Sequence, residues 1–123
     1  MTITEPELRT TATTWEPVCD LKRLTPGRGV AALVDGAPVA LFHLGEGETF
    51  AIGNVDPFSG ASVLSRGIVG DVDGVPTVAS PIYKQRFDLR TGRSIDDETV
   101  AVSAYDVRVV DGICEVRPGG TLP

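Results

Sequence analysis

The sequence predicts a small all-β domain built from antiparallel strands. The dipeptides Asp35-Gly36 and Asp111-Gly112 each separate two short apolar runs, and such dipeptides favour tight hairpin turns because they tolerate positive φ angles. No segment repeats apolar residues at helical spacing, while 14 glycines and 9 prolines interrupt the chain. A sandwich or a barrel is therefore the expected architecture.

The strands follow one another between turn signals. We expect Trp15 and Val18 to face inward on the first strand, and "GEGE" to form the turn at 45–48. The expected strands lie at 15–19, 29–34, 37–44, 49–53, 105–110 and 113–116.

The segment 53–95 departs from this regular spacing. It is long and rich in glycine and proline, and it allows one short helical turn near "GASVLSRG". Long ordered loops on a β scaffold often carry function, so we expect a loop subdomain here.

The domain boundaries follow from composition. We expect one domain over 14–117, a flexible lead-in at 1–13 and a flexible tail at 118–123, since 123 residues suit a single core. The chain start lacks a secretion signal and no apolar run could span a bilayer. The net charge of −6 without a basic stripe disfavours nucleic-acid and membrane partners. A cytoplasmic location is the expectation.

Few residues suggest chemistry of their own. Cys19 and Cys114 form no Cys-x-x-Cys pair, and we expect two reduced thiols within the packing, with a disulfide as the alternative. His43 stands alone in an apolar run. The string "GDVDG" (70–74) lacks most calcium ligands and is typical of a hairpin turn.

Two further strings could hold catalytic groups. "SIDDETV" (94–100) clusters carboxylates without a partner base, so we expect a solvated acidic turn. Pro81 disfavours the helix that would place Ser80 and Lys84 on one face for nucleophilic catalysis. The motifs therefore predict no active site within this chain.

Two loops resemble those of the Rieske iron–sulfur family, which clasp a [2Fe–2S] cluster with C-P-H-x-G and C-P-x-H motifs. This chain reads D-P-F-S-G at 56–60 and S-P-I-Y at 80–83, followed by "FDLRTG" at 87–92. The prolines, the glycine and the final string stand where the family has them. The resemblance implies a Rieske-like antiparallel β-sandwich or barrel with a two-loop subdomain.

The four ligand positions differ from that family's pattern. They hold Asp56, Phe58, Ser80 and Tyr83 in place of Cys, His, Cys and His. Phenylalanine has no lone pair, and this set cannot replace two thiolates and two imidazoles. We therefore expect no cluster, no metal and no catalytic residue here. Instead, we expect Phe58 and Tyr83 to meet across the loop tips, and Asp56 and Ser80 to hydrogen bond to each other or to loop amides.

Longer strings, among them "DPFSGASVLSRGIVGD" and "VASPIYKQRFDLRTG", resemble the small subunits of assimilatory NAD(P)H-dependent nitrite reductases. This resemblance implies a large-subunit partner that carries FAD, an iron–sulfur cluster and sirohaem and reduces nitrite to ammonium. The small subunit would bring no redox centre. The docking candidates are Phe58, Ser59, Tyr83, Lys84, Gln85 and Arg86.

Two other functions remain open at this point. The chain could be an interaction or regulatory module on a degenerate Rieske frame that serves another reductase or oxygenase. It could also be an electron carrier with an unusual metal site.

Overall fold

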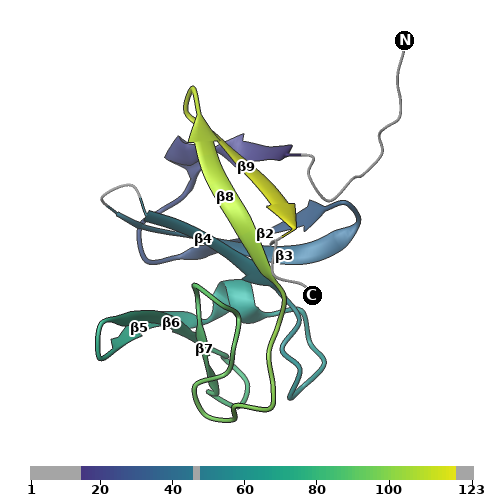
Figure 1. The fold of residues 1–123 in the computed structure, drawn as a ribbon, viewed down its shortest axis with the longest axis vertical. Coiled ribbons are helices and arrows are strands. Elements are labelled where there is room, and N and C mark those ends of the chain that lie inside the picture. The colour runs from purple at the N-terminus through teal and green to yellow at the C-terminus, as the bar shows by residue number, and fades with distance from the viewer. Residues whose placement is uncertain (1–14, 46–47, 119–123) are drawn as a thin grey trace.

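The computed structural model describes residues 15–45 and 48–118, which fold into two β-sheets (Figure 1). The larger sheet has six strands in the order β1-β9-β8-β4-β3-β2, and the smaller has three in the order β5-β6-β7. The strands are β1 (Glu16–Asp20), β2 (Gly29–Val34), β3 (Ala37–Gly45), β4 (Glu48–Gly53), β5 (Ile68–Val72), β6 (Val75–Ala79), β7 (Arg86–Asp88), β8 (Ala104–Val110) and β9 (Ile113–Pro118). All neighbouring strands are antiparallel, so the all-β prediction is confirmed.

Two short 3₁₀ turns, η3 (Leu21–Arg23) and η4 (Leu64–Arg66), complete the described elements. The turn η4 lies within the string for which one short helical turn is expected. Within the described residues, no helix is long and apolar enough to cross a membrane.

Asp-Gly turns close three hairpins. Asp35 has φ 52° and Gly36 φ 81°, and Asp111 and Gly112 repeat these angles at 52° and 81°. Both central residues of such a turn need positive φ. The backbone twist of the turn then matches the right-handed twist of the flanking strands. The third turn lies within "GDVDG", between β5 and β6, so the prediction of a hairpin turn there is confirmed.

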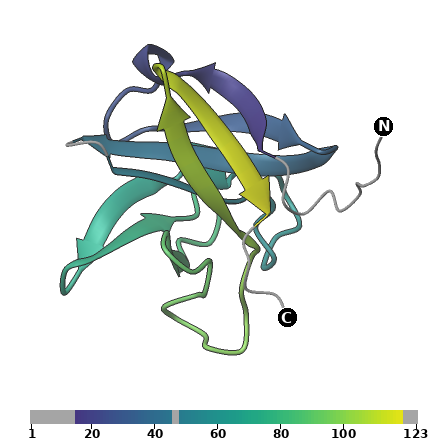
Figure 2. The same ribbon diagram turned by 45° about the horizontal axis from the view of Figure 1, so that its top comes forward.

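The six-stranded sheet curls until its two edges approach each other (Figure 2). Glu16 Oε1 on β1 accepts a hydrogen bond of 2.9 Å from the amide of Asp35, in the β2–β3 turn. Strong twist lets a sheet close on itself in this way. The smaller sheet and the long loops lie on one side of this nearly closed barrel (Figures 1 and 2).

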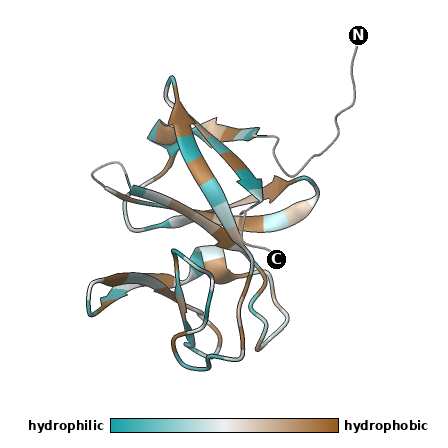
Figure 3. Ribbon diagram, in the orientation of Figure 1, coloured by the Kyte–Doolittle hydropathy of each residue, from teal (hydrophilic) through white to brown (hydrophobic). Residues whose placement is uncertain are grey.

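Strand β3 separates two hydrophobic cores. Val39 and Leu41 belong to the core inside the curled sheet, while Ala40 and Phe42 belong to the core against the second sheet. Successive side chains of a strand point to opposite faces, so a strand covered on both sides needs a continuous apolar run. On β8 and β9, hydrophilic and hydrophobic residues alternate (Figure 3), because one face of these strands meets solvent.

The first strand differs in part from its prediction. Val18 packs against the first core, as expected. The ring of Trp15 instead lies against the guanidinium groups of Arg108 and Arg117, 4.3 and 4.4 Å from its centroid. Cation–π attraction therefore holds Trp15 outside the core.

Three expected segments lie wholly or partly outside the described residues: the lead-in at 1–13, most of the tail at 118–123, and two positions of the "GEGE" turn.

Candidate functional site

The first loop is a tight turn built around Asp56. The amide of Asp56 donates to Ala61 O (2.8 Å), and the amide of Gly60 donates back to Asp56 O (2.7 Å). The carboxyl oxygen Oδ1 of Asp56 accepts from the amide of Phe58 at 2.9 Å. Gly60 has φ 78°, which glycine adopts at little cost.

The second loop repeats these contacts around Ser80. Its amide donates to Gln85 O (2.9 Å), and the amide of Lys84 donates to Ser80 O (3.0 Å). The hydroxyl of Ser80 accepts from the amide of Ile82 at 3.2 Å. Lys84 takes the place of the glycine, with φ 66°, a conformation that costs a residue with a Cβ about 1–2 kcal/mol.

A third copy follows at once, around Asp88. The amide of Asp88 donates to Arg93 O (2.9 Å), and that of Gly92 donates to Asp88 O (2.7 Å). Asp88 Oδ1 accepts from the amide of Arg90 at 2.8 Å, and Gly92 has φ 79°. The third loop belongs to the "FDLRTG" string, and its spacing of Asp and Gly matches that of "DPFSG". That shared spacing is the sequence signal that could have identified it.

One hydrogen bond joins the first two loops at the positions where the Rieske family has its cysteines. Ser80 Oγ donates to Asp56 Oδ2 over 2.6 Å, and both residues are buried. Ser59 Oγ donates to the same carboxyl oxygen at 3.1 Å. Burial of a carboxyl group is costly unless its oxygens are hydrogen-bonded, and Asp56 accepts three such bonds from Phe58, Ser59 and Ser80. The expected pairing of Asp56 with Ser80 is confirmed.

The two aromatic residues at the histidine positions have different surroundings. The ring of Phe58 packs against the second core, with its centroid 6.1 Å from that of Phe87. Tyr83 is 60% exposed. The expected meeting of Phe58 and Tyr83 is therefore wrong, because the fully buried ring of Phe87 offers Phe58 an apolar partner from below the loops.

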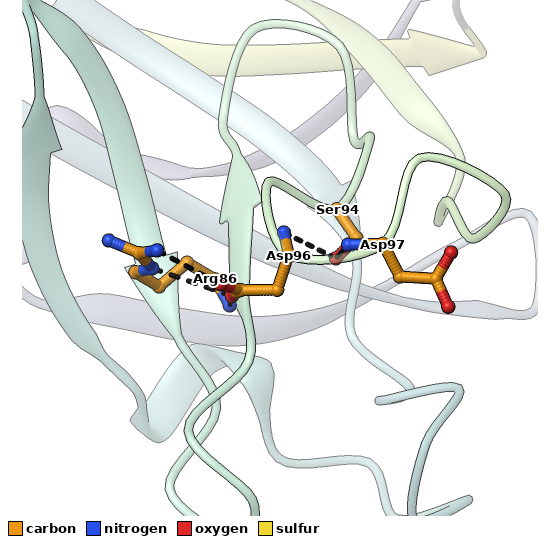
Figure 4. Close-up of polar contacts among 4 residues, drawn as sticks. All are labelled: Arg86, Ser94, Asp96 and Asp97. Carbon is orange, nitrogen blue, oxygen red and sulfur yellow. Dashed lines mark hydrogen bonds and ion pairs between the residues drawn. The ribbon is translucent and has the colours of Figure 1, made fainter.

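Arg86, the last docking candidate, is tied to the segment after the third loop (Figure 4). Its guanidinium donates to Asp96 Oδ1 at 2.9 Å, and its amide donates to Asp96 Oδ2 at 2.7 Å. The hydrogen bond from Arg86 lowers the pKa of the Asp96 carboxyl. The buried hydroxyl of Ser94 accepts from the amides of Asp96 and Asp97, at 3.2 and 3.1 Å. The acidic string is thus only partly a solvated turn.

The tip of the second loop is the exposed part of the site. Ile82 is 43% exposed, and Tyr83, Lys84, Gln85 and Asp96 line a shallow cleft of about 250 Å³. The side-chain oxygen Oε1 of Gln85 is buried and has no hydrogen-bond partner among the described residues. A buried acceptor without a donor is destabilising by about 1–3 kcal/mol, so a donor from a second molecule could satisfy it.

The [2Fe–2S] cluster that the fold family implies does not fit the residues at its four ligand positions. Asp56 and Ser80 are engaged with each other, and Phe58 offers no donor atom. Two thiolates and two imidazoles are the donors such a cluster takes. Across residues 15–45 and 48–118, no group of three or more His, Cys, Asp or Glu residues is placed to hold a metal ion.

The other titratable candidates lie away from the loops. Cys19 and Cys114 are opposite each other on β1 and β9, both thiols are free, and both pack in or against the first core, as expected. Burial raises the pKa of Cys114 to about 11. His43 Nδ1 donates to Glu48 O at 3.3 Å on an exposed part of β3.

Comparisons with known proteins place this geometry in a family. The family described as "Rieske-like [2Fe-2S] domain" matches residues 14–117. The nitrite reductase (NADH) small subunit of Salmonella typhimurium is 45% identical over 104 residues, which cover 84% of this chain and 96% of that protein.

A solved structure and a longer relative extend the comparison. A crystal structure from Mycobacterium tuberculosis, assigned as an NADH-dependent nitrite reductase small subunit, is 49% identical with a TM-score of 0.83, covering 88% of this chain and 97% of that one. The nitrite reductase [NAD(P)H] large subunit of Klebsiella oxytoca is 43% identical over 98 residues, which are 80% of this chain and 10% of that protein. The chain belongs to the Rieske-like [2Fe–2S] domain family and, within it, to the nitrite reductase small subunits.

Proposed function

We propose that this chain is the small subunit of a cytoplasmic NAD(P)H-dependent nitrite reductase and acts by binding the large subunit, without a redox centre of its own. The large subunit would carry FAD, an iron–sulfur cluster and sirohaem and would reduce nitrite to ammonium with electrons from NAD(P)H. The small subunit supplies a binding surface to that assembly.

The observation that carries this proposal is that similar domains occur both as a separate chain and as a segment of a much longer chain. A relative of 45% identity is a separate small subunit, and another of 43% identity is a segment of a protein named as the large subunit. A covalent link raises the local concentration of one part beside the other. A domain that occurs both as a separate chain and joined to the large subunit is expected to bind the large subunit through a surface of its own.

The tip of the second loop is the proposed docking surface. It combines the exposed side chains of Ile82 and Tyr83 with the cation of Lys84, and aromatic residues are enriched at such interfaces. Lys84 occupies a left-handed position that the first and third loops give to glycine. Strain of this kind is typical of functional sites, where the side chain serves a contact.

Three further docking candidates surround this tip. Gln85 has the unpartnered buried oxygen, Arg86 is held by Asp96, and Ser59 lies half-buried beside the buried carboxyl of Asp56. Phe58, by contrast, packs against Phe87 and the second core. Its loss should therefore act on stability first and on binding only indirectly.

The test measures binding of the cognate large subunit to the purified chain by calorimetry. We expect Tyr83→Ala and Lys84→Gly each to weaken binding about tenfold, equivalent to about 1.4 kcal/mol. Neither should lower the melting temperature, and Lys84→Gly should raise it, because glycine relieves the left-handed backbone at this position. Leu33→Ala is the matched control, because Leu33 is 67% exposed on β2, outside this surface.

Three outcomes would contradict the proposal in different parts. Failure of the unaltered chain to bind the large subunit would overturn the small-subunit assignment. Unchanged binding by both loop variants would overturn the docking surface alone. Stoichiometric iron with a visible absorption band in the purified chain would overturn the absence of a redox centre and favour the electron carrier.

A further inference from the structure

Three arginines from two distant parts of the sequence gather at one cleft. Arg23 from η3, Arg28 from the loop before β2 and Arg66 from η4 line a cleft of about 640 Å³, and no lining residue is acidic. The sequence shows no basic stripe, so this cluster is visible only in the fold.

The charge of this cleft opposes that of the whole chain. The net charge is −6 with 11 lysines and arginines in total, yet three of these line one cleft. Arg86, Arg90, Arg108 and Arg117 each pair with an acidic residue. Among the described residues, no acidic side chain forms an ion pair with a cleft arginine. A local positive potential is therefore left for an external anion.

Two Arg-Gly dipeptides, Arg28-Gly29 and Arg66-Gly67, line the cleft. A Cβ at Gly29 would lie 2.5 Å from Ser65 O, and a Cβ at Gly67 would overlap Ala79 O. Only glycine allows this close approach of β2 to η4, and of the residue between η4 and β5 to β6. As a result, Arg28 and Arg66, the residues that precede these glycines, lie at the same opening.

Four backbone amides around the cleft are already engaged. The amides of Gly27 and Arg28 donate to His43 O (2.8 Å) and Thr25 O (3.0 Å). Those of Arg66 and Gly67 donate to Val63 O (2.8 Å) and Leu64 O (3.0 Å). Phosphate sites usually supply free backbone amides. This cleft offers guanidinium groups instead, which bind carboxylates and phosphates alike in a bidentate manner, so the neighbours of the arginines must decide between these ligands.

An exposed apolar side chain adjoins the arginines. Ile68 lines the same cleft and is 74% exposed. Arginine beside apolar surface is a common composition of the energetically important part of protein interfaces. A protein surface therefore fits the cleft better than a small hydrophilic anion.

We infer that the arginine cleft is a second contact with the large subunit and binds acidic side chains on it. This inference rests on the proposed function. The guanidinium groups pair with the partner's carboxylates, and Ile68 contacts apolar surface between them. Because such pairs attract at a distance, the cleft should also speed association at low ionic strength.

The test compares charge reversals on the purified full chain, with the cognate large subunit as the binding partner. Arg28→Glu and Arg66→Glu should each weaken binding at least about tenfold, and the double variant about 100-fold, since like charges across an interface repel. Lys22→Glu is the matched control, because Lys22 is exposed next to Arg23 but does not line the cleft. It should alter binding by less than about threefold. Arg28→Gln and Arg66→Gln provide neutral variants of the same positions, and melting curves check that all variants fold.

The outcomes separate this inference from the proposed function. If the unaltered chain binds the large subunit and Arg28→Glu and Arg66→Glu bind it equally well, only the role of the cleft is overturned. If the unaltered chain does not bind, the proposed function is overturned. A second arm titrates the isolated chain with inorganic phosphate and with NADPH while amide chemical shifts are followed. Saturable changes in amide chemical shift that are confined to the cleft, at micromolar phosphate or NADPH, would overturn the inference that the cleft binds protein carboxylates. The absence of such changes would support that inference.

Discussion

At the scale of single residues, the closed pair of Asp56 and Ser80 explains how two loops of Rieske type hold together here. A carboxyl group and a hydroxyl group occupy the cysteine positions. Each accepts a hydrogen bond from the backbone amide two residues further on, that of Phe58 or Ile82. Their mutual bond of 2.6 Å then joins the loops directly. Side-chain oxygens of Asp and Ser commonly organise turns in this way, so the loops need no external ligand to keep their shape.

Replacement of Ser80 by alanine tests this account. The substitution removes the donor to Asp56 Oδ2 inside a site where water cannot take its place, because both residues are buried. We expect the free energy of unfolding in urea to fall by about 1–3 kcal/mol. Thr99→Ala is the control, since Thr99 Oγ1 donates to Asp97 over the same 2.6 Å at an exposed site. Its loss should be within about 0.5 kcal/mol. Equal losses for the two variants would contradict the importance of burial.

The sequence was sufficient to identify these positions but not their partners. Asp56 and Ser80 could be paired in advance because the family's loops bring those positions together. The contact of Phe58 with Phe87 could not, since an aromatic ring can pack against any apolar surface within reach and only the fold decides which one is near. The arginine cleft was missed for the same reason, because its members are up to 43 positions apart in the chain.

At the scale of elements, local signals and long-range contacts differ in how well sequence reports them. The Asp-Gly hairpins were predicted correctly because two adjacent residues set the turn. The second sheet was not identified, and its segment was interpreted as long loops. Strands β5 and β7 are short, and Gly70 and Pro76 interrupt the alternation. Pairing across 68–88, rather than propensity, makes these residues strands.

The repeated loop allows a matched comparison of two glycines. Gly60 and Gly92 hold the same position in the first and third loops, with φ 78° and 79°. A Cβ at Gly60 would meet open space, whereas a Cβ at Gly92 would overlap the backbone oxygen of Val102. We expect Gly60→Ala to cost about 1–2 kcal/mol from the left-handed backbone alone. Gly92→Ala should cost more, or prevent folding. Urea unfolding and the yield of folded protein measure the difference, and equal costs would contradict the close approach of Val102.

The ion pair between Arg86 and Asp96 predicts a dependence of stability on pH. The hydrogen bond from Arg86 lowers the pKa of Asp96 below its ordinary 3.8. A carboxyl group whose pKa is lower in the folded chain stabilises the fold above its unfolded pKa, and this contribution is lost as pH falls through the folded value. We therefore expect Asp96→Asn to be less stable than the unaltered chain at neutral pH and equally stable in strong acid. In an Arg86→Gln background the same substitution should have a smaller effect at neutral pH, because only the backbone amide of residue 86 then still lowers the pKa of Asp96. A persistent difference in acid would contradict this origin.

At the scale of the whole molecule, β3 makes one folding unit of two sheets. Its odd-numbered side chains fill the core of the curled sheet, and its even-numbered side chains fill the core against β6 and β7. Neither core can lose β3 without exposing the other. A docking subunit gains from this arrangement, since the loops of the second sheet stay fixed relative to the arginine cleft between the sheets. Pre-organised surfaces bind with a smaller entropy cost.

This shared strand predicts that the two sheets unfold together. Val39 and Val78 are both fully buried, the first in the core of the curled sheet and the second in the core between the sheets. Replacement of either by alanine should lower the free energy of unfolding by about 2 kcal/mol. The loss should appear equally in two probes: fluorescence of Trp15, the single tryptophan, which packs on β8 and β9, and hydrogen exchange of the β6 amides. Coincident shifts are the signature of an all-or-none transition. If Val78→Ala instead shifted the β6 amides alone and left the tryptophan transition in place, the second sheet would be an independent unit, and β3 would not couple the loops to the barrel.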